Sequence, residues 1–295
     1  MDESARKKVV AFLVLTFAFS TPFYYLIISA GTVNVAGGLY VAGIMWCPGV
    51  AALLTRVFFQ RNLRGIGWRC GKTRYQVSSY VIPVVAGLGV YGLVWTVGIG
   101  GVSVERLTSG GADLFGIAQS ASLPLAVALA GSIGFLEMVI FTTGEELGWR
   151  GLLVPELAQL TEYTGAALIT GLVWALFHYP LLFFADYNNS STSLWYTSLF
   201  FTVGITAGSF IVTWLRLRSG SVWTAVIMHA SHNLFIGVFE RLTVPEGSTA
   251  YITNEGGAGL AIAYSMIAYW CWRQRTQLPG STPDGAMTRM VHQTA

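Results

Sequence analysis

Polar side chains that can take part in hydrolysis gather in three short motifs in the second half of the chain. They are Glu145, Glu146 and Arg150 in the first motif, His178 in the second, and His229 with Asn233 in the third. A carboxylate can take a proton from water, and an imidazole can orient that water or protonate a leaving amine. Histidine and asparagine side chains can donate hydrogen bonds to the oxyanion that forms at an attacked carbonyl. These residue types together suit the hydrolysis of an amide bond.

Helical spacing gives the two glutamates different tasks. Glu146 and Arg150 are four residues apart, so they can form an ion pair on one face of a helix. Glu145 points about 100° away, at about 3.6 residues per turn, and lacks that cation. We therefore expect the pair to hold the end of the helix and Glu145 to face a cavity.

Each motif also has a purely structural interpretation. The glutamates and the arginine can form a solvated helix cap, and His178 can be a hydrogen-bonded histidine of the core. His229 and Asn233 share one helical face, where they can join neighbouring helices by hydrogen bonds. We expect His232, beside that face, to be structural. Catalysis is the stronger interpretation because all three motifs occur in order within apolar segments, where ionisable side chains are costly and usually functional.

Membrane-spanning helices are the elements that must position these side chains. Of the 295 residues, 54% are hydrophobic and only 11% are charged, whereas about 25% of a typical soluble domain is charged. Windows of roughly 20 apolar residues, the length that crosses a bilayer, predict eight spans. They are residues 9–30, 34–58, 77–99, 122–144, 165–185, 194–215, 221–240 and 257–272. Because these segments lack strand alternation, we predict an all-α, polytopic transmembrane helical bundle.

The positions of lysine and arginine predict the orientation of the bundle. Of the 17 lysines and arginines, all but Arg106 and Arg241 fall on the same side as the N-terminus. Positive residues concentrate on the cytoplasmic side, so we predict a multi-pass protein of the cell membrane with both termini cytoplasmic and the candidate site near that side. We expect one membrane-embedded domain over residues 1–278 and a flexible tail over 279–295. So few charges exclude a partner such as nucleic acid, which needs clustered basic residues.

The three motifs in this order resemble those of the CPBP (CAAX protease and bacteriocin-processing) family, over residues 145–233. These are intramembrane endopeptidases, and they include Rce1-like enzymes that remove the last three residues of prenylated CAAX proteins. The resemblance implies hydrolysis of a peptide bond in a peptide or protein substrate that is delivered from the membrane, with or without a lipid attached. Membrane lipid is the other expected partner.

The resemblance also implies a role for each motif. Glu145 corresponds to the glutamate that activates water, and His178 to its partner on that water. His229 and Asn233 correspond to the pair on the oxyanion side, while Glu146 and Arg150 support the first motif. The second motif of the family usually begins with phenylalanine, and here it begins with Trp174. Because an aromatic ring is kept, we expect packing rather than chemistry to be affected.

The sequence leaves the requirement for a metal open. Glu145, His178 and His229 could supply three Zn²⁺ ligands and leave a fourth position for water. Oxyanion stabilisation by His229 and Asn233 needs no metal, and we favour a glutamate-type protease without a cofactor. Either chemistry requires water, so we expect a water-filled cavity that is open to the cytoplasm.

Two other functions are compatible with the motifs. The first is a proton- or ion-coupled transporter in which Glu145, His178 and His229 relay the ion. The second is a non-catalytic family member that acts as a scaffold or in bacteriocin immunity. Replacement of Glu145 by alanine would distinguish them, because a protease would lose cleavage, a transporter would lose flux, and a scaffold would tolerate the change.

Overall fold

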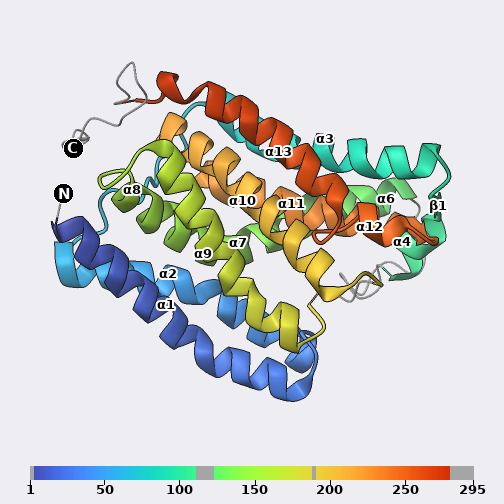
Figure 1. Ribbon diagram of the computed structural model, residues 1–295, viewed down its shortest axis with the longest axis horizontal. Coiled ribbons are helices and arrows are strands. Elements are labelled where there is room, and N and C mark those ends of the chain that lie inside the picture. Colours follow the sequence, from blue (N-terminus) through green and yellow to red (C-terminus); the bar gives the residue numbers. More distant parts are fainter. Residues whose placement is uncertain (1–2, 111–122, 188–190, 280–295) are drawn as a thin grey trace.

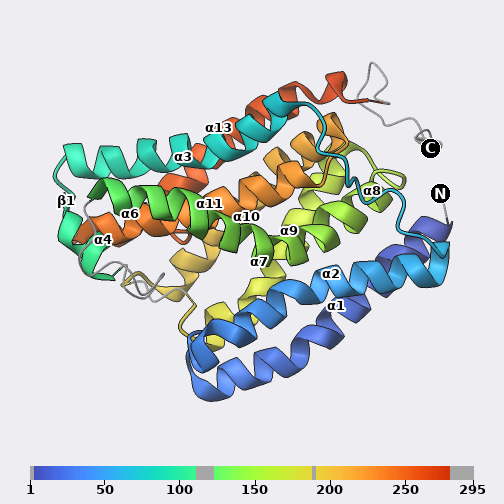
Figure 2. The ribbon, with the colours of Figure 1, turned by 180° about the vertical axis from the view of Figure 1, so that it is seen from behind.

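The computed structural model describes residues 3–110, 123–187 and 191–279 and shows a bundle of long helices that are tilted against one another (Figure 1, Figure 2). The long helices are α1 (Glu3–Ala30), α2 (Leu39–Gln60), α3 (Thr73–Thr96), α9 (Tyr163–Phe184), α10 (Leu194–Ser219), α11 (Trp223–Leu242) and α13 (Ala258–Arg273). Each lies at one of the predicted spans, and the predicted all-α class is confirmed. The predicted tail lies outside the described residues from residue 280 onward.

The fourth predicted span is assembled from several consecutive helical pieces, and its first residue, 122, lies outside the described residues. The pieces are α6 (Leu123–Leu129), a π-helical turn (Ala130–Gly134), α7 (Phe135–Gly148), a second π-helical turn (Trp149–Leu153) and α8 (Val154–Leu157). The polar residues of the first motif thus stay helical beyond the predicted end of the span. Single π-helical turns inside helices are frequent at functional sites.

Short elements connect the long helices at the ends of the bundle. They are the 3-10 turns Val35–Gly38 and Arg275–Gln277, the short helices α4 (Val104–Gly110) and α12 (Thr249–Ile252), and the strands β1 (Gly100–Val102) and β2 (Thr243–Pro245). The two strands pair antiparallel, with Gly100 opposite Pro245. Because β1 follows α3 and β2 follows α11, this pairing holds the ends of those two helices together.

Five helices in the described part of the chain are long and apolar enough to cross a membrane. They are Glu3–Ala30, Val35–Gln60, Thr73–Thr96, Tyr163–Phe184 and Leu194–Ser219. Their length and composition support a membrane protein. The count of eight spans and the cytoplasmic position of the termini stay predictions.

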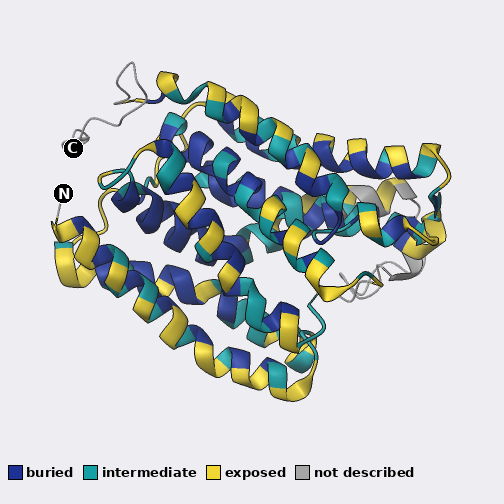
Figure 3. Cartoon of the chain, in the orientation of Figure 1, coloured by how far each residue is buried: buried dark blue, intermediate teal, exposed yellow. Residues whose placement is uncertain are grey.

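The motif-bearing helix α7 packs against α2 and α11, and its C-terminal half, which carries the glutamates, is buried. Buried residues concentrate in the middle of the bundle, while exposed residues follow the outer faces of α1, α3 and α13 (Figure 3). One apolar cluster contains Phe12, Trp149, Trp174 and Phe177, so it joins α1, α7 with its π-helical turn, and α9. The first two motifs therefore lie next to the core and not at its edge.

Two buried arginines hold the π-helical turn that follows α7. Nη2 of Arg56 donates to the carbonyl oxygen of Gly151 at 2.8 Å, and Nε of Arg216 donates to that of Arg150 at 2.9 Å. Arg56 and Arg216 are only 2% and 6% exposed. Both belong to the basic residues that predict the cytoplasmic side. They tie α2 and α10 to the first motif as well, because buried carbonyls need hydrogen-bond donors.

Candidate active site

The two glutamates of the first motif lie where α7 comes very close to α2. A Cβ atom added to Gly144 would lie 2.6 Å from the carbonyl oxygen of Met45, and one added to Gly148 would lie 2.5 Å from Cβ of Pro48. Small residues permit this close approach between membrane helices. The two glycines therefore help to set the position at which α7 presents its glutamates to the bundle.

The predicted ion pair between Glu146 and Arg150 is confirmed. Nη1 of Arg150 donates hydrogen bonds to both carboxylate oxygens of Glu146, at 2.9 and 3.1 Å. Both side chains are completely buried. A solvated helix cap, which was the structural interpretation of this motif, does not describe them.

His229 on α11 joins this pair, which its position in the sequence does not reveal. Its Nδ1 lies 3.0 Å from Oε1 of Glu146. An ionised carboxylate can only accept a hydrogen bond, so Nδ1 carries a hydrogen and Nε2 is an acceptor in the neutral ring. His229 can donate to an oxyanion through Nε2 only as an imidazolium. The carboxylate of Glu146 lies where it can balance that charge.

Glu145 contacts a different set of partners, as its offset from Glu146 on the helix predicts. Its Oε2 accepts a hydrogen bond from Nε1 of Trp174 at 2.7 Å and another from Nε1 of Trp149 at 3.3 Å. The residue is 2% exposed. Within the described residues, no side chain donates to Oε1 of Glu145. One carboxylate oxygen is therefore held by indoles, and the other is left for a water molecule or a substrate.

His178 lies one helical turn after Trp174 on α9, in an aromatic environment. Its Nδ1 is 2.8 Å from the carbonyl oxygen of Trp174. A carbonyl oxygen only accepts, so Nδ1 carries the hydrogen and Nε2 of the neutral ring is free to accept a proton. The rings of Phe201 and Tyr187 lie 5.4 and 5.5 Å away between centroids. With Nδ1 protonated, Nε2 can accept a hydrogen bond from a catalytic water molecule.

Asn233 lies one turn after His229 on α11 and is partly exposed. No hydrogen bond joins its side chain to another of the residues that the structure describes. Its amide is therefore not committed to the bonds between helices that the structural interpretation assigns to it. Its place beside the oxyanion stays a prediction.

Trp174 connects all three motifs, and its contacts go beyond the packing that we expect from an aromatic ring. Besides the hydrogen bond to Glu145, its ring lies 5.1 Å from that of His229 and 6.1 Å from that of His178. The guanidinium carbon of Arg150 lies 4.4 Å from its ring centroid. A phenylalanine ring could make the ring contacts, but it has no N–H to donate to a carboxylate.

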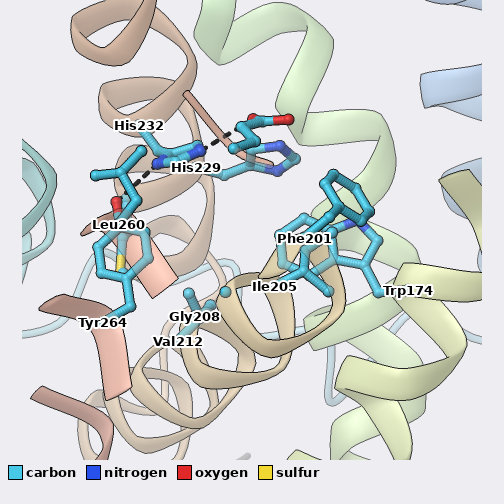
Figure 4. Close-up of a pocket in the computed structure, with 12 residues that line it drawn as sticks. Trp174, Phe201, Ile205, Gly208, Val212, His229, His232, Leu260 and Tyr264 are labelled. Atoms are coloured by element: carbon cyan, nitrogen blue, oxygen red, sulfur yellow. Dashed lines mark hydrogen bonds and ion pairs between the residues drawn. The ribbon is translucent and has the colours of Figure 1, made fainter. Parts of the chain in front are cut away.

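A largely apolar cavity adjoins these residues (Figure 4). Its lining residues come from α9, α10, α11, α13 and the segment before α13, and they are Trp174, Phe201, Gly204, Ile205, Gly208, Val212, Met228, His229, His232, Glu255, Leu260 and Tyr264. Figure 4 shows Trp174 and Tyr264 on opposite sides of it. Glu145 and His178 are not among the lining residues, so Glu145 does not face this cavity. Glu145 adjoins it through Trp174.

Glu255 is a further carboxylate beside the site, partly exposed, that sequence reasoning missed. Its Oε1 lies 3.0 Å from Nε2 of His232, and its Oε2 accepts a hydrogen bond of 3.0 Å from the hydroxyl of Tyr187. Nδ1 of His232 lies 2.7 Å from the hydroxyl of Tyr264. Both ring nitrogens of His232 are thus used within the protein, in agreement with its expected structural role. The sequence did offer one signal, because Glu255 lies only two residues before the predicted span 257–272.

Comparison with known proteins connects this geometry to a family. Residues 124–235 match the sequence profile of the family described as type II CAAX prenyl endopeptidase Rce1-like. All three motifs lie inside the matched segment. Over this segment the chain is similar to the Rce1-like, or CPBP, family.

The chain is also similar to a curated protein. It is 34% identical over 136 residues to a protein named CAAX prenyl protease 2 from Methanococcus maripaludis. The matched residues are 45% of this chain and 48% of that protein. The chain thus matches about half of the length of this relative.

Glu145, His178 and His229, which could supply zinc ligands if a metal is used, do not form a metal site in the described part of the chain. No group of three or more histidine, cysteine, aspartate or glutamate side chains there is placed to hold a metal ion. Oε2 of Glu145 and Nδ1 of His229 face protein donors and acceptors instead. We therefore derive no catalytic step through a metal.

Proposed function

We propose that this chain is an intramembrane endopeptidase that uses a water molecule activated by Glu145. The contacts of Trp174 support the proposal most directly, because this side chain meets the carboxylate of Glu145 and the rings of His178 and His229. Three motifs that are far apart in the sequence thus come together around one indole. The Rce1-like family match over the same segment gives independent support.

The first step uses the free oxygen of Glu145. Oε1 takes a proton from water, and Nε2 of His178 accepts the other hydrogen of that water and so orients it. The resulting hydroxide attacks the scissile carbonyl and forms a tetrahedral oxyanion. When the C–N bond breaks, the protonated Glu145 returns its proton to the leaving amine.

The oxyanion is stabilised from α11. Nε2–H of the His229 imidazolium and the amide of Asn233 donate to it, as an oxyanion hole requires. Glu146 holds the imidazolium through Nδ1, and Arg150 keeps Glu146 ionised. The two adjacent glutamates therefore act differently, because one is balanced by cations and the other receives only neutral donors.

The substrate we propose is a protein or peptide tail of the CAAX type, delivered from the membrane and carrying a lipid. The relative named CAAX prenyl protease 2 supports this class, and the apolar cavity beside His229 supports an apolar substrate segment. We further propose a multi-pass protein of the cell membrane with the site near the cytoplasmic side, in contact with membrane lipid. The reaction needs no metal.

Cleavage of a farnesylated CAAX-type peptide by the purified full chain in lipid nanodiscs tests the proposal. Mass spectrometry measures release of the C-terminal tripeptide. We expect Glu145→Gln to lower kcat by about 100-fold or more, as loss of a general base does. Glu137→Gln, on the same helix but two turns away, is the matched control and keeps its activity.

Two results would contradict the proposal. A folded wild type that cleaves neither farnesylated nor unmodified peptides is not a protease of this class. If Glu145→Gln instead abolishes a proton flux measured in proteoliposomes, the chain is a transporter.

A further inference from the structure

Glu145 and Glu146 are both buried, yet their carboxylates are stabilised by different means. Glu146 receives the charged side chain of Arg150 and the ring of His229. Glu145 receives two indole N–H groups, both on Oε2. A buried carboxylate needs such partners, because an ionised group without them is expensive away from water.

A neutral donor is suited to a catalytic base. An indole has one N–H, no acceptor and no charge, so it fixes a carboxylate oxygen without forming an ion pair. An arginine in the same place would hold Glu145 in its ionised form and make it a weaker base. The bond from Trp174, at 2.7 Å, is short for N–H···O, as bonds to charged acceptors are.

Trp174 is itself held on several sides. The guanidinium of Arg150 stacks over its ring with Cζ 4.4 Å from the centroid, and the ring of His229 meets it at 74°. Its own carbonyl oxygen accepts the Nδ1 hydrogen of His178. The indole is also almost fully buried, at 7% exposed. Its N–H direction is therefore set by the same groups that form the candidate site.

We propose that Trp174 is a positioning residue, whose indole N–H holds Oε2 of Glu145 so that Oε1 is presented to the attacking water. The same residue sets the tautomer of His178 through its backbone carbonyl. Trp149 has a lesser part, since its N–H is 3.3 Å from the same oxygen. This inference rests on the proposed function of Glu145 as the base.

Replacement of Trp174 by phenylalanine keeps an aromatic ring under Arg150 and removes the N–H. With the farnesylated peptide as probe, we expect kcat to fall about 10- to 100-fold, since a hydrogen bond to a charged group contributes this much. KM changes by less than about twofold, because the lost bond holds the base and not the substrate. The acidic limb of the profile of kcat against pH moves to higher pH, because the ionised base loses a donor.

Trp95→Phe is the matched control. Its indole also donates a hydrogen bond within the protein, to Oγ1 of Thr243 at 3.0 Å, but on α3 and away from Glu145. We expect this variant to keep the kcat, KM and pH profile of the wild type. If Trp174→Phe does not fold, β-(3-benzothienyl)alanine at position 174 removes the N–H with the shape of the side chain unchanged, and we expect the same fall in kcat.

The outcomes separate this inference from the proposed function. If Glu145→Gln is inactive while the variants at position 174 keep the kcat and pH profile of the wild type, the inference is overturned and the proposed function stands. If KM rises and kcat is unchanged, Trp174 binds substrate and does not position the base. A wild type without any cleavage overturns both.

Discussion

Nδ1 of His229 lies 3.0 Å from Oε1 of Glu146, although 83 residues separate them in the chain. Through this contact α11 and α7 share one buried charge network, which Arg150 completes. The carboxylate is the negative centre of the network. Its removal would leave a buried guanidinium and an imidazole without their common partner.

We therefore expect Glu146→Gln to lower the free energy of unfolding by about 3–5 kcal/mol, as removal of one partner of a buried ion pair does. Thermal unfolding in detergent, followed by a thiol-reactive dye at the buried cysteines, measures this. The matched control is Glu3→Gln, which removes an exposed pair with Lys7 at the same helical spacing. Equal stability of the two variants would contradict a stabilising network.

The close approach of α7 to α2 gives a second prediction, at Gly144. Alanine there would place its Cβ 2.6 Å from the carbonyl oxygen of Met45 and 2.7 Å from Cα of Trp46. Because backbone atoms cannot move aside easily, we expect a loss of about 1–3 kcal/mol of stability and reduced cleavage through displacement of Glu145. Gly89→Ala on α3, where nothing lies within 4 Å, should be tolerated. If the two variants are equally stable, α7 and α2 do not approach each other closely at Gly144.

A pH-dependent contact joins the end of α9 to the connection between α1 and α2. Oδ1 of Asp186 accepts a hydrogen bond of 2.6 Å from the backbone N–H of Val33, and this bond holds the pKa of Asp186 below its usual value. The contribution to stability is therefore present above the pKa of the unfolded chain, about 3.9 for aspartate. It is lost as pH falls through the lower pKa of the folded state.

Asp186→Asn tests this assignment, because an amide oxygen can still accept but does not titrate near pH 4. We expect the wild type to be more stable than the variant at pH 6 and the difference to shrink as pH falls below about 4. Unfolding midpoints measured from pH 6 to pH 3 give the comparison. A difference that stays constant with pH would show that the charge of Asp186 plays no part.

Metal content provides a fourth prediction. We expect the purified, active chain to contain well below one zinc per molecule by elemental mass spectrometry. Cleavage should continue after treatment with a membrane-permeant chelator, because Glu145 and His229 face partners within the protein. One tightly bound zinc per chain, together with activity that is lost on chelation and restored by Zn²⁺, would contradict this.

The positions of the long helices could be predicted well, because length and apolarity are local properties of a segment. The four-residue spacing of Glu146 and Arg150 predicted their ion pair for the same reason. The sequence could not predict that the helical stretch with the first motif continues through a π-helical turn to Leu157. Carbonyl groups of that turn accept hydrogen bonds from Arg56 and Arg216 on other helices, and such contacts are not visible in the local sequence.

The site was predicted as a set of residues but not as an arrangement. The sequence alone determined which side chains can do chemistry, their order on the helices, and which neighbours within one helix meet. Only the tertiary structure decided that Trp174 donates to Glu145, that His229 faces Glu146, and that Glu255 lies by the cavity. The physical reason is that contacts between helices depend on their relative rotation and depth. Close packing such as that at Gly144 sets the rotation and depth of each helix. The spacing of residues within a single helix does not predict either quantity.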